Sequence, residues 1–130
     1  TQSRSSAASD VYKRQVASGI VLMAWMPADE RAALVAALDT DHAALEADLT
    51  ACRANGFFYN GKGVVEGAAG VAAPVFGADG RALAAINISG PRDRVAAQID
   101  SLSQQTVQTA ARVTEELQRR THNKRIPGGN

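Results

Sequence analysis

The sequence predicts an α+β fold in which helices pack across one face of an antiparallel sheet of three or four strands. Two apolar runs, residues 70–76 and 81–89, flank a Gly-Ala-Asp-Gly segment, and this pattern is typical of a β-hairpin. Residues 92–120 instead repeat apolar side chains at spacings of three and four, which predicts one long C-terminal helix. A chain of 130 residues is long enough for one domain with a hydrophobic core.

The composition is that of a globular domain with a core of small side chains. Hydrophobic residues make up 45% of the chain and charged residues 21%, but aromatic residues only 5%. The net charge of +1 gives no indication of a nucleic-acid or acidic partner. A single cysteine, Cys52, excludes an internal disulfide and fits a reducing compartment. No apolar run is long enough to span a membrane, so we expect a cytoplasmic protein without membrane contact.

The N-terminal half predicts a leader followed by three short helices. Residues 1–15 are serine-rich and basic without periodicity, and are interpreted as a disordered leader or a scar of sequencing and assembly. Residues 16–26 form an apolar run that Pro27 ends, which predicts a short buried helix. Residues 28–38 carry acids in their first turn and leucines four apart, the pattern of an amphipathic helix.

The third helix is predicted from its ends. Asp41 is the expected N-cap and Gly56 the expected C-terminal stop, with apolar side chains at helical spacing between them. Residues 57–60 then predict a short strand, because aromatic side chains gather there. A glycine-rich connection with room for one more edge strand leads to the hairpin. After the long helix, residues 121–130 are interpreted as a disordered basic tail.

The two faces of the hairpin differ in polarity. Side chains alternate along a strand, so Ile86 and Ile88 share one face and Asn87 and Ser89 share the other. A two-residue turn would place Gly70, Ala72 and Pro74 on the Asn87 face, opposite to the valines of the first strand.

The isoleucine and valine face is the predicted seat of the long helix, whose apolar stripe needs a surface to cover. Two interpretations of the Asn87 face remain open. It is either a shallow floor of a small-molecule site, with Asn87 and Ser89 as hydrogen-bonding groups, or a sheet face exposed to solvent.

Three ordered blocks resemble a known family. ASGIVLMAWMPADERAALVAAL, LEADLTACRANGFFYN and GAAGVAAPVFGADGRALAAINISGPRDR are similar, in order and spacing, to the effector-binding domain of IclR-type transcriptional regulators. The likeness covers residues 16–120. It implies a GAF-like sheet, a small organic effector such as a carboxylate or an aromatic acid, and assembly as a homodimer or homotetramer. It also implies that DNA is bound only through a winged helix-turn-helix domain that this chain lacks, as it lacks the first strands of the effector domain.

The resemblance also implies which residues contact the effector: Ser18, Gly19, Ile20, Asn60, Gly70, Asn87 and Ser89. Ser18, Gly19 and Ser89 agree with common residue types of the family, whereas Ile20 replaces a residue that is often small or basic. Backbone N–H groups near Gly19 could hold an anion, although a glycine there also fits close helix packing.

No residue pattern indicates catalysis, a metal or a cofactor. Cys52 lies on the apolar stripe of its helix, so we expect a packing thiol and not a nucleophile. His42 and His122 are too far apart in sequence to suggest a metal site, and the glutamates form no acid–base pair. We therefore expect no enzyme. The alternative to a regulator domain is a stand-alone GAF-like sensory or protein-interaction module.

Overall fold

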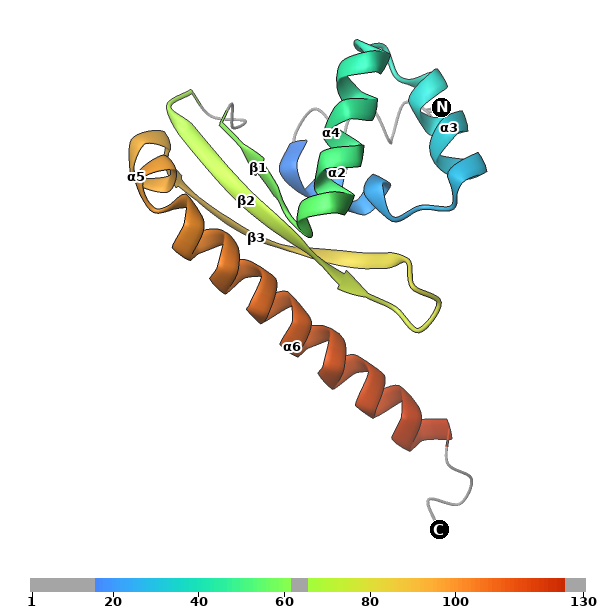
Figure 1. Ribbon diagram of the computed structural model, residues 1–130. Coiled ribbons are helices and arrows are strands. Elements are labelled where there is room, and N and C mark those ends of the chain that lie inside the picture. The colour runs from blue at the N-terminus through green and yellow to red at the C-terminus, as the bar shows by residue number, and fades with distance from the viewer. Residues whose placement is uncertain (1–15, 62–65, 126–130) are drawn as a thin grey trace.

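The computed structural model describes residues 16–61 and 66–125, which form a sheet between two helical layers (Figure 1). In chain order the elements are α2 (Val16–Ala24), α3 (Ala28–Ala37), α4 (His42–Asn55), β1 (Phe58–Asn60), β2 (Ala68–Phe76), β3 (Ala82–Pro91), α5 (Arg92–Ala97) and α6 (Ile99–Arg125). The predicted α+β fold, its antiparallel sheet and its long C-terminal helix are confirmed. The predicted leader, part of the glycine-rich connection and residues 126–130 lie outside the described residues.

The ends of α4 are set by the two residues that the sequence indicates. The side chain of Asp41 accepts a hydrogen bond from the backbone N–H of Ala44 at 3.1 Å. Gly56 ends the helix with φ of 82°, a left-handed conformation that favours glycine. Both predicted caps of this helix are confirmed.

Two arginines stabilise the C-terminal end of α2, where backbone carbonyls have no partner in the next turn. Arg53 of α4 donates to the carbonyl oxygen of Ala24 at 3.1 Å, and Arg31 of α3 donates to that of Met26 at 2.8 Å. The end of α2 is thereby joined to both neighbouring helices.

The sheet has the order β1-β2-β3, and its register follows the predicted alternation. Gly70 lies opposite Ser89, and Ala72 lies opposite Asn87. The loop itself differs from the predicted two-residue turn, because the Gly77 N–H donates to the Arg81 carbonyl across three intervening residues.

An irregularity in β3 restores the predicted pairing. Val75 lies opposite Ala84 but Phe76 lies opposite Ala82, so Leu83 has no partner on β2 and forms a bulge. The longer loop shifts the register by one residue and the bulge shifts it back. The predicted faces are therefore correct even though the predicted turn is wrong.

Strand β2 is the centre of the core, because residues 69–75 are all buried. On one face Ala73 and Val75 pack with Ala110 of α6, and Ile86 of β3 packs against them. This confirms the predicted seat of the long helix. On the other face Ala72 belongs to the cluster formed by the three short helices. The members of that cluster are Ala17, Ile20, Val21, Met23, Ala24, Val35, Leu38, Leu45, Leu49, Cys52 and Ala72.

The predicted single helix over residues 92–120 is two helices. α5 ends at Ala97, Gln98 leaves the helical conformation with φ of −119° and ψ of 22°, and α6 follows. Val95 of α5 packs on Val71, and Ile99 of α6 packs on the same cluster, so the apolar stripe continues across the break. α6 also extends to residue 125, so residues 121–125, which the sequence predicts as part of the tail, are helical.

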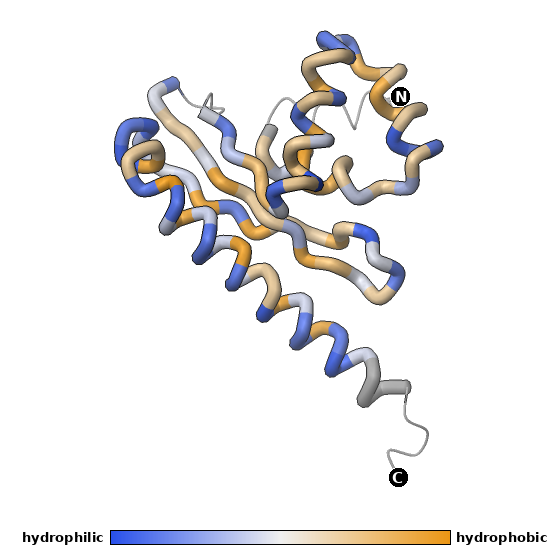
Figure 2. The backbone as a smooth tube through the Cα atoms, in the orientation of Figure 1, coloured by the Kyte–Doolittle hydropathy of each residue, from blue (hydrophilic) through white to orange (hydrophobic). Residues whose placement is uncertain are grey.

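Figure 2 shows hydrophobic and hydrophilic residues interspersed along the length of α6.

An ion pair and a ring contact further join the hairpin to the layer of short helices. Arg81, just after the loop, forms an ion pair with Glu30 of α3 at 2.5 Å. The rings of Trp25 and Phe76 meet edge to face, with centroids 5.3 Å apart. Within residues 16–61 and 66–125, no helix is long and apolar enough to cross a membrane.

Thr114 fastens α6 to the end of β2. Its hydroxyl accepts a hydrogen bond from the Phe76 N–H at 3.0 Å and donates to the Ala110 carbonyl at 3.0 Å. We expect Thr114→Val to lower the free energy of unfolding by about 1 kcal/mol, because the shape is kept and the bond to β2 is lost. Urea denaturation measures this. Thr109→Val, at an exposed position of the same helix, is the matched control; an equal loss in both variants would contradict this role of Thr114.

Cys52 is completely buried, and burial raises the pKa of its thiol from 9.0 to about 12. We expect the folded protein to react with a disulfide reagent at mildly alkaline pH far more slowly than the urea-unfolded protein, because the thiolate is the reacting form. Ionisation of the unfolded thiol should also lower stability as the pH rises above 9.0.

An exposed thiol introduced by Ala78→Cys in the hairpin loop is the control for the reagent. Equal rates at the two cysteines in the folded variant would show that Cys52 is accessible.

Candidate functional site

Four of the residues that the resemblance implies come together on one face of the sheet. Asn60, Gly70 and Ser89 lie side by side across the three strands, as partners in the β1–β2 and β2–β3 registers. Asn87 lies in the next row on the same face, opposite Ala72. Sequence-distant strands thus place three polar side chains around one glycine.

Gly70 leaves room for the side chain of Asn87. A Cβ atom at position 70 would lie 3.2 Å from Oδ1 of Asn87 and 3.4 Å from the carbonyl oxygen of Ile88. Because Gly70 does not have a positive φ, backbone conformation does not require a glycine at this position. The space is nevertheless tight, because an added side chain would require the Asn87 amide to move by a few tenths of an ångström.

The polar groups of this face are uncharged and partly open. Asn87 and Ser89 are exposed, Asn60 is half-buried, and among the described residues no protein group hydrogen bonds to the side chain of Asn87 or Ser89. Arg92, just beyond β3, donates its Nε–H to the carbonyl of Gly61 at 2.7 Å. An amide and a hydroxyl can both donate and accept, so the face can bind a ligand through hydrogen bonds.

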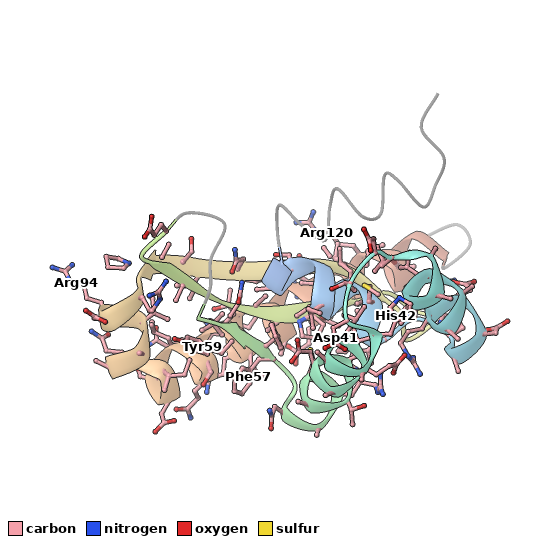
Figure 3. All side chains as sticks on the ribbon, turned by 90° about the horizontal axis from the view of Figure 1, so that it is seen from above. Asp41, His42, Phe57, Tyr59, Arg94 and Arg120 are labelled. Carbon is pink, nitrogen blue, oxygen red and sulfur yellow. The ribbon has the colours of Figure 1, made fainter. Side chains whose placement is uncertain are left out.

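Helix α2 covers the neighbouring part of the same face (Figure 3). Ala72 and Ala85 pack with the core residues of this helix. Part of this face is therefore covered by a helix and part of it is exposed to solvent. On β2 it is covered at Ala72, whereas on β3 the side chains of Asn87 and Ser89 are exposed.

The three remaining predicted residues lie on α2, one layer from the sheet. Ser18 is half-buried and Gly19 is buried. Ile20 is completely buried in the core cluster, so neither its side chain nor its backbone reaches the surface of the chain. The structure gives Ile20 a packing role in holding α2 on the sheet.

Phe58 is a candidate that was missed from sequence. It lies opposite Ala72, in the row of Asn87, and its half-buried ring packs against the short-helix cluster. The sequence contains a signal that could have identified Phe58. Side chains alternate along β1, so Phe58 shares a face with Asn60, whereas Phe57 and Tyr59 pack toward α6.

Other chemically active side chains form no second centre. In the part of the chain that the structure describes, no three His, Cys, Asp or Glu residues gather where they could hold a metal ion. His42 hydrogen bonds through Nε2 to the carbonyl of Leu38 at 2.8 Å, at the end of α3. Asp41 and His42 lie together at the start of α4 (Figure 3).

A family model described as "Bacterial transcriptional regulator IclR C-terminal" matches residues 7–116. The match covers most of the chain and begins within the segment that we interpreted as a leader. A search of the curated proteins gave no match.

Solved structures with the same fold include three bacterial regulators. A protein from Rhodococcus sp. RHA1, described as a transcriptional regulator, is 30% identical, with a TM-score of 0.70 over 80% of this chain and 46% of its own. The C-terminal domain of KdgR from E. coli is 26% identical, with a TM-score of 0.69 over 81% and 70%. Thermotoga maritima IclR is 21% identical, with a TM-score of 0.74 over 82% and 47%. The chain thus spans about half the length of the first and third of these proteins.

The packing of Asn87 on Gly70 can be measured in a double-mutant cycle. We expect Gly70→Ala to lower stability by about 1 kcal/mol, because the added methyl group presses on the amide and on the Ile88 carbonyl. Asn87→Ala should recover part of that loss when it is combined with Gly70→Ala. Gly90→Ala is the control, because its Cβ would make an ordinary 3.7 Å contact with Val95. Additive effects of the two substitutions would contradict the contact.

Proposed function

The chain belongs to the IclR family of bacterial transcriptional regulators, and from this premise we propose that it senses a small organic effector as part of the family's C-terminal domain. The observation that carries the proposal is the group of hydrogen-bonding side chains around Gly70. An exposed amide and hydroxyl next to a covered apolar surface are the ingredients of a small-molecule site.

The proposed binding floor consists of Asn60, Gly70, Asn87 and Ser89. The Asn87 amide and the Ser89 hydroxyl donate to oxygen atoms of the effector, and neutral Asn60 does not repel an anion as an aspartate would. Phe58 supplies apolar surface beside them, which suits an effector with an aromatic ring or alkyl chain. These groups support a small carboxylate or aromatic acid as the effector.

Helix α2 supplies the proposed second wall. Ser18 and Gly19 lie on the helix that packs over this face, so an effector held on the floor would contact two layers of the domain. Ile20, the third residue that the resemblance implies on this helix, is buried in the core cluster next to them. Binding between two layers gives the effector a means to favour one arrangement of them over another.

We propose that, in a longer protein, this preference for one arrangement of the two layers alters DNA binding. In that proposal, homodimers or homotetramers of the longer protein present its DNA-binding domains, and the effector shifts the population of their arrangements. Such a role is cytoplasmic and requires no catalytic residue, metal or cofactor. The alternative, a stand-alone GAF-like sensory or protein-interaction module, predicts that this face contacts proteins instead of binding a ligand.

A thermal-shift screen of small aliphatic and aromatic carboxylic acids, each with its amide as a neutral counterpart, tests the proposal. We expect at least one acid to raise the Tm in a concentration-dependent manner. Asn87→Ala and Ser89→Ala should each weaken binding of that acid about three- to tenfold, because each removes a hydrogen bond.

The matched controls remove an asparagine and a serine side chain at positions away from the proposed floor. Asn55→Ala on α4 and Ser101→Ala on α6 change exposed residues away from the floor and should leave affinity unchanged. A ligand whose affinity is the same in all four variants would place its site outside the proposed floor.

A further inference from the structure

The chain contains two Asn-Gly pairs, Asn55–Gly56 and Asn60–Gly61. In such a pair the backbone nitrogen of the glycine can attack the side-chain amide carbon of the asparagine, because a glycine has no Cβ to hinder the approach. The sequence gives the two pairs the same local chemistry. The backbone around each pair therefore decides which of them reacts in the folded protein.

The pair Asn55–Gly56 is held by the C-terminal end of α4. Asn55 is exposed, but it is the last residue of the helix, and the N–H of Gly56 donates to the carbonyl of Cys52 at 2.8 Å. Gly56 also has the left-handed φ of 82° that ends the helix. The nitrogen that would react is occupied, so the helix end must open before the attack.

The backbone around Asn60–Gly61 is held less firmly. β1 has only three residues, lies at one edge of the sheet and ends at Asn60. In the described part of the chain, no backbone carbonyl accepts a hydrogen bond from the Gly61 N–H, whereas the Gly61 carbonyl accepts one from Arg92. The end of a short edge strand opens at low cost in free energy. The Gly61 nitrogen can therefore reach the amide more readily than the Gly56 nitrogen can.

We propose that Asn60–Gly61 is a site of spontaneous deamidation that adds a negative charge to the proposed binding floor. The Gly61 nitrogen bonds to Cγ of Asn60, the bond between Cγ and the side-chain nitrogen breaks, and ammonia leaves with the proton of the Gly61 N–H. Water then opens the cyclic imide at either of its carbonyl carbons, which gives aspartate or isoaspartate. The two steps consume water alone and involve no oxidation or reduction.

The new charge lies in the row that Asn60 forms with Gly70 and Ser89. Its effect on ligands rests on the proposed function, because a carboxylate on the floor repels an anionic effector that the neutral amide does not repel. Isoaspartate also inserts an additional carbon atom into the main chain, which disturbs the pairing of β1 with β2. An aged molecule therefore differs from a newly made one at this site.

Peptide mapping by mass spectrometry, after incubation at mildly alkaline pH, tests the proposal. In the urea-unfolded protein we expect both pairs to convert at similar rates. In the folded protein we expect Asn60 to convert at least about tenfold faster than Asn55, because β1 opens more readily than the capped helix.

Two glycine variants separate this reaction from direct hydrolysis of the amide. Gly61→Ala should remove most of the conversion at Asn60, because the added methyl group hinders the attack. Gly61 does not have a positive φ, and its Cβ would meet only the mobile end of the Tyr59 ring, at 3.3 Å from Oη, so this variant should fold. Gly90→Ala, whose Cβ would make an ordinary 3.7 Å contact, is the control and should leave the rate unchanged.

Equal rates at Asn55 and Asn60 in the folded protein would overturn the proposal, and so would conversion that Gly61→Ala leaves unchanged. Ion-exchange chromatography separates the converted protein, which should bind the acid found in the thermal-shift screen about three- to tenfold more weakly. Unchanged affinity would refute the effect on the floor. If no acid binds at all, the proposed function fails, whereas the deamidation is still decided by the mass measurement.

Discussion

The burial of β2 on both faces by small side chains is the constraint on which the rest of the structure depends. From residue 69 to residue 75 the strand consists of Ala, Gly, Val and Pro, and all of it is buried. Valines on one face hold α5 and α6, and Ala72 on the other face meets α2. Small side chains on the strand let both helical layers approach the sheet closely, which is how a chain with 5% aromatic residues can build a packed core.

The same use of small residues produces the candidate site. Where β2 changes from Ala72 to Gly70, the missing methyl group leaves space that the Asn87 amide occupies. Buried Ala72 on β2 and exposed Asn87 on β3 are partners in the same row, so apolar packing and hydrogen-bonding side chains lie directly beside each other on this face. In a regulator of this family, a boundary of that kind is suited to couple ligand contact to the position of a helix.

Local patterns predicted the elements and their faces, because alternation and helical spacing depend on neighbouring residues. They could not predict features that depend on distant ones. The bulge at Leu83 compensates for a longer loop, and the break at Gln98 is hidden because the apolar stripe continues across it. The ion pair of Glu30 with Arg81 joins residues 51 positions apart. Family position placed Ile20 among the site residues, and local pattern did not predict its complete burial in the core cluster.

The contact between Trp25 and Phe76 gives the molecule an optical property. Trp25 is the only tryptophan in the chain, and it follows directly after α2, with its ring edge to face with a residue at the end of β2. Indole emission depends on the polarity around the ring, so the emission of this one tryptophan senses the junction between the α2 layer and the hairpin. Movement of that helical layer relative to the sheet would change the emission spectrum without any introduced label.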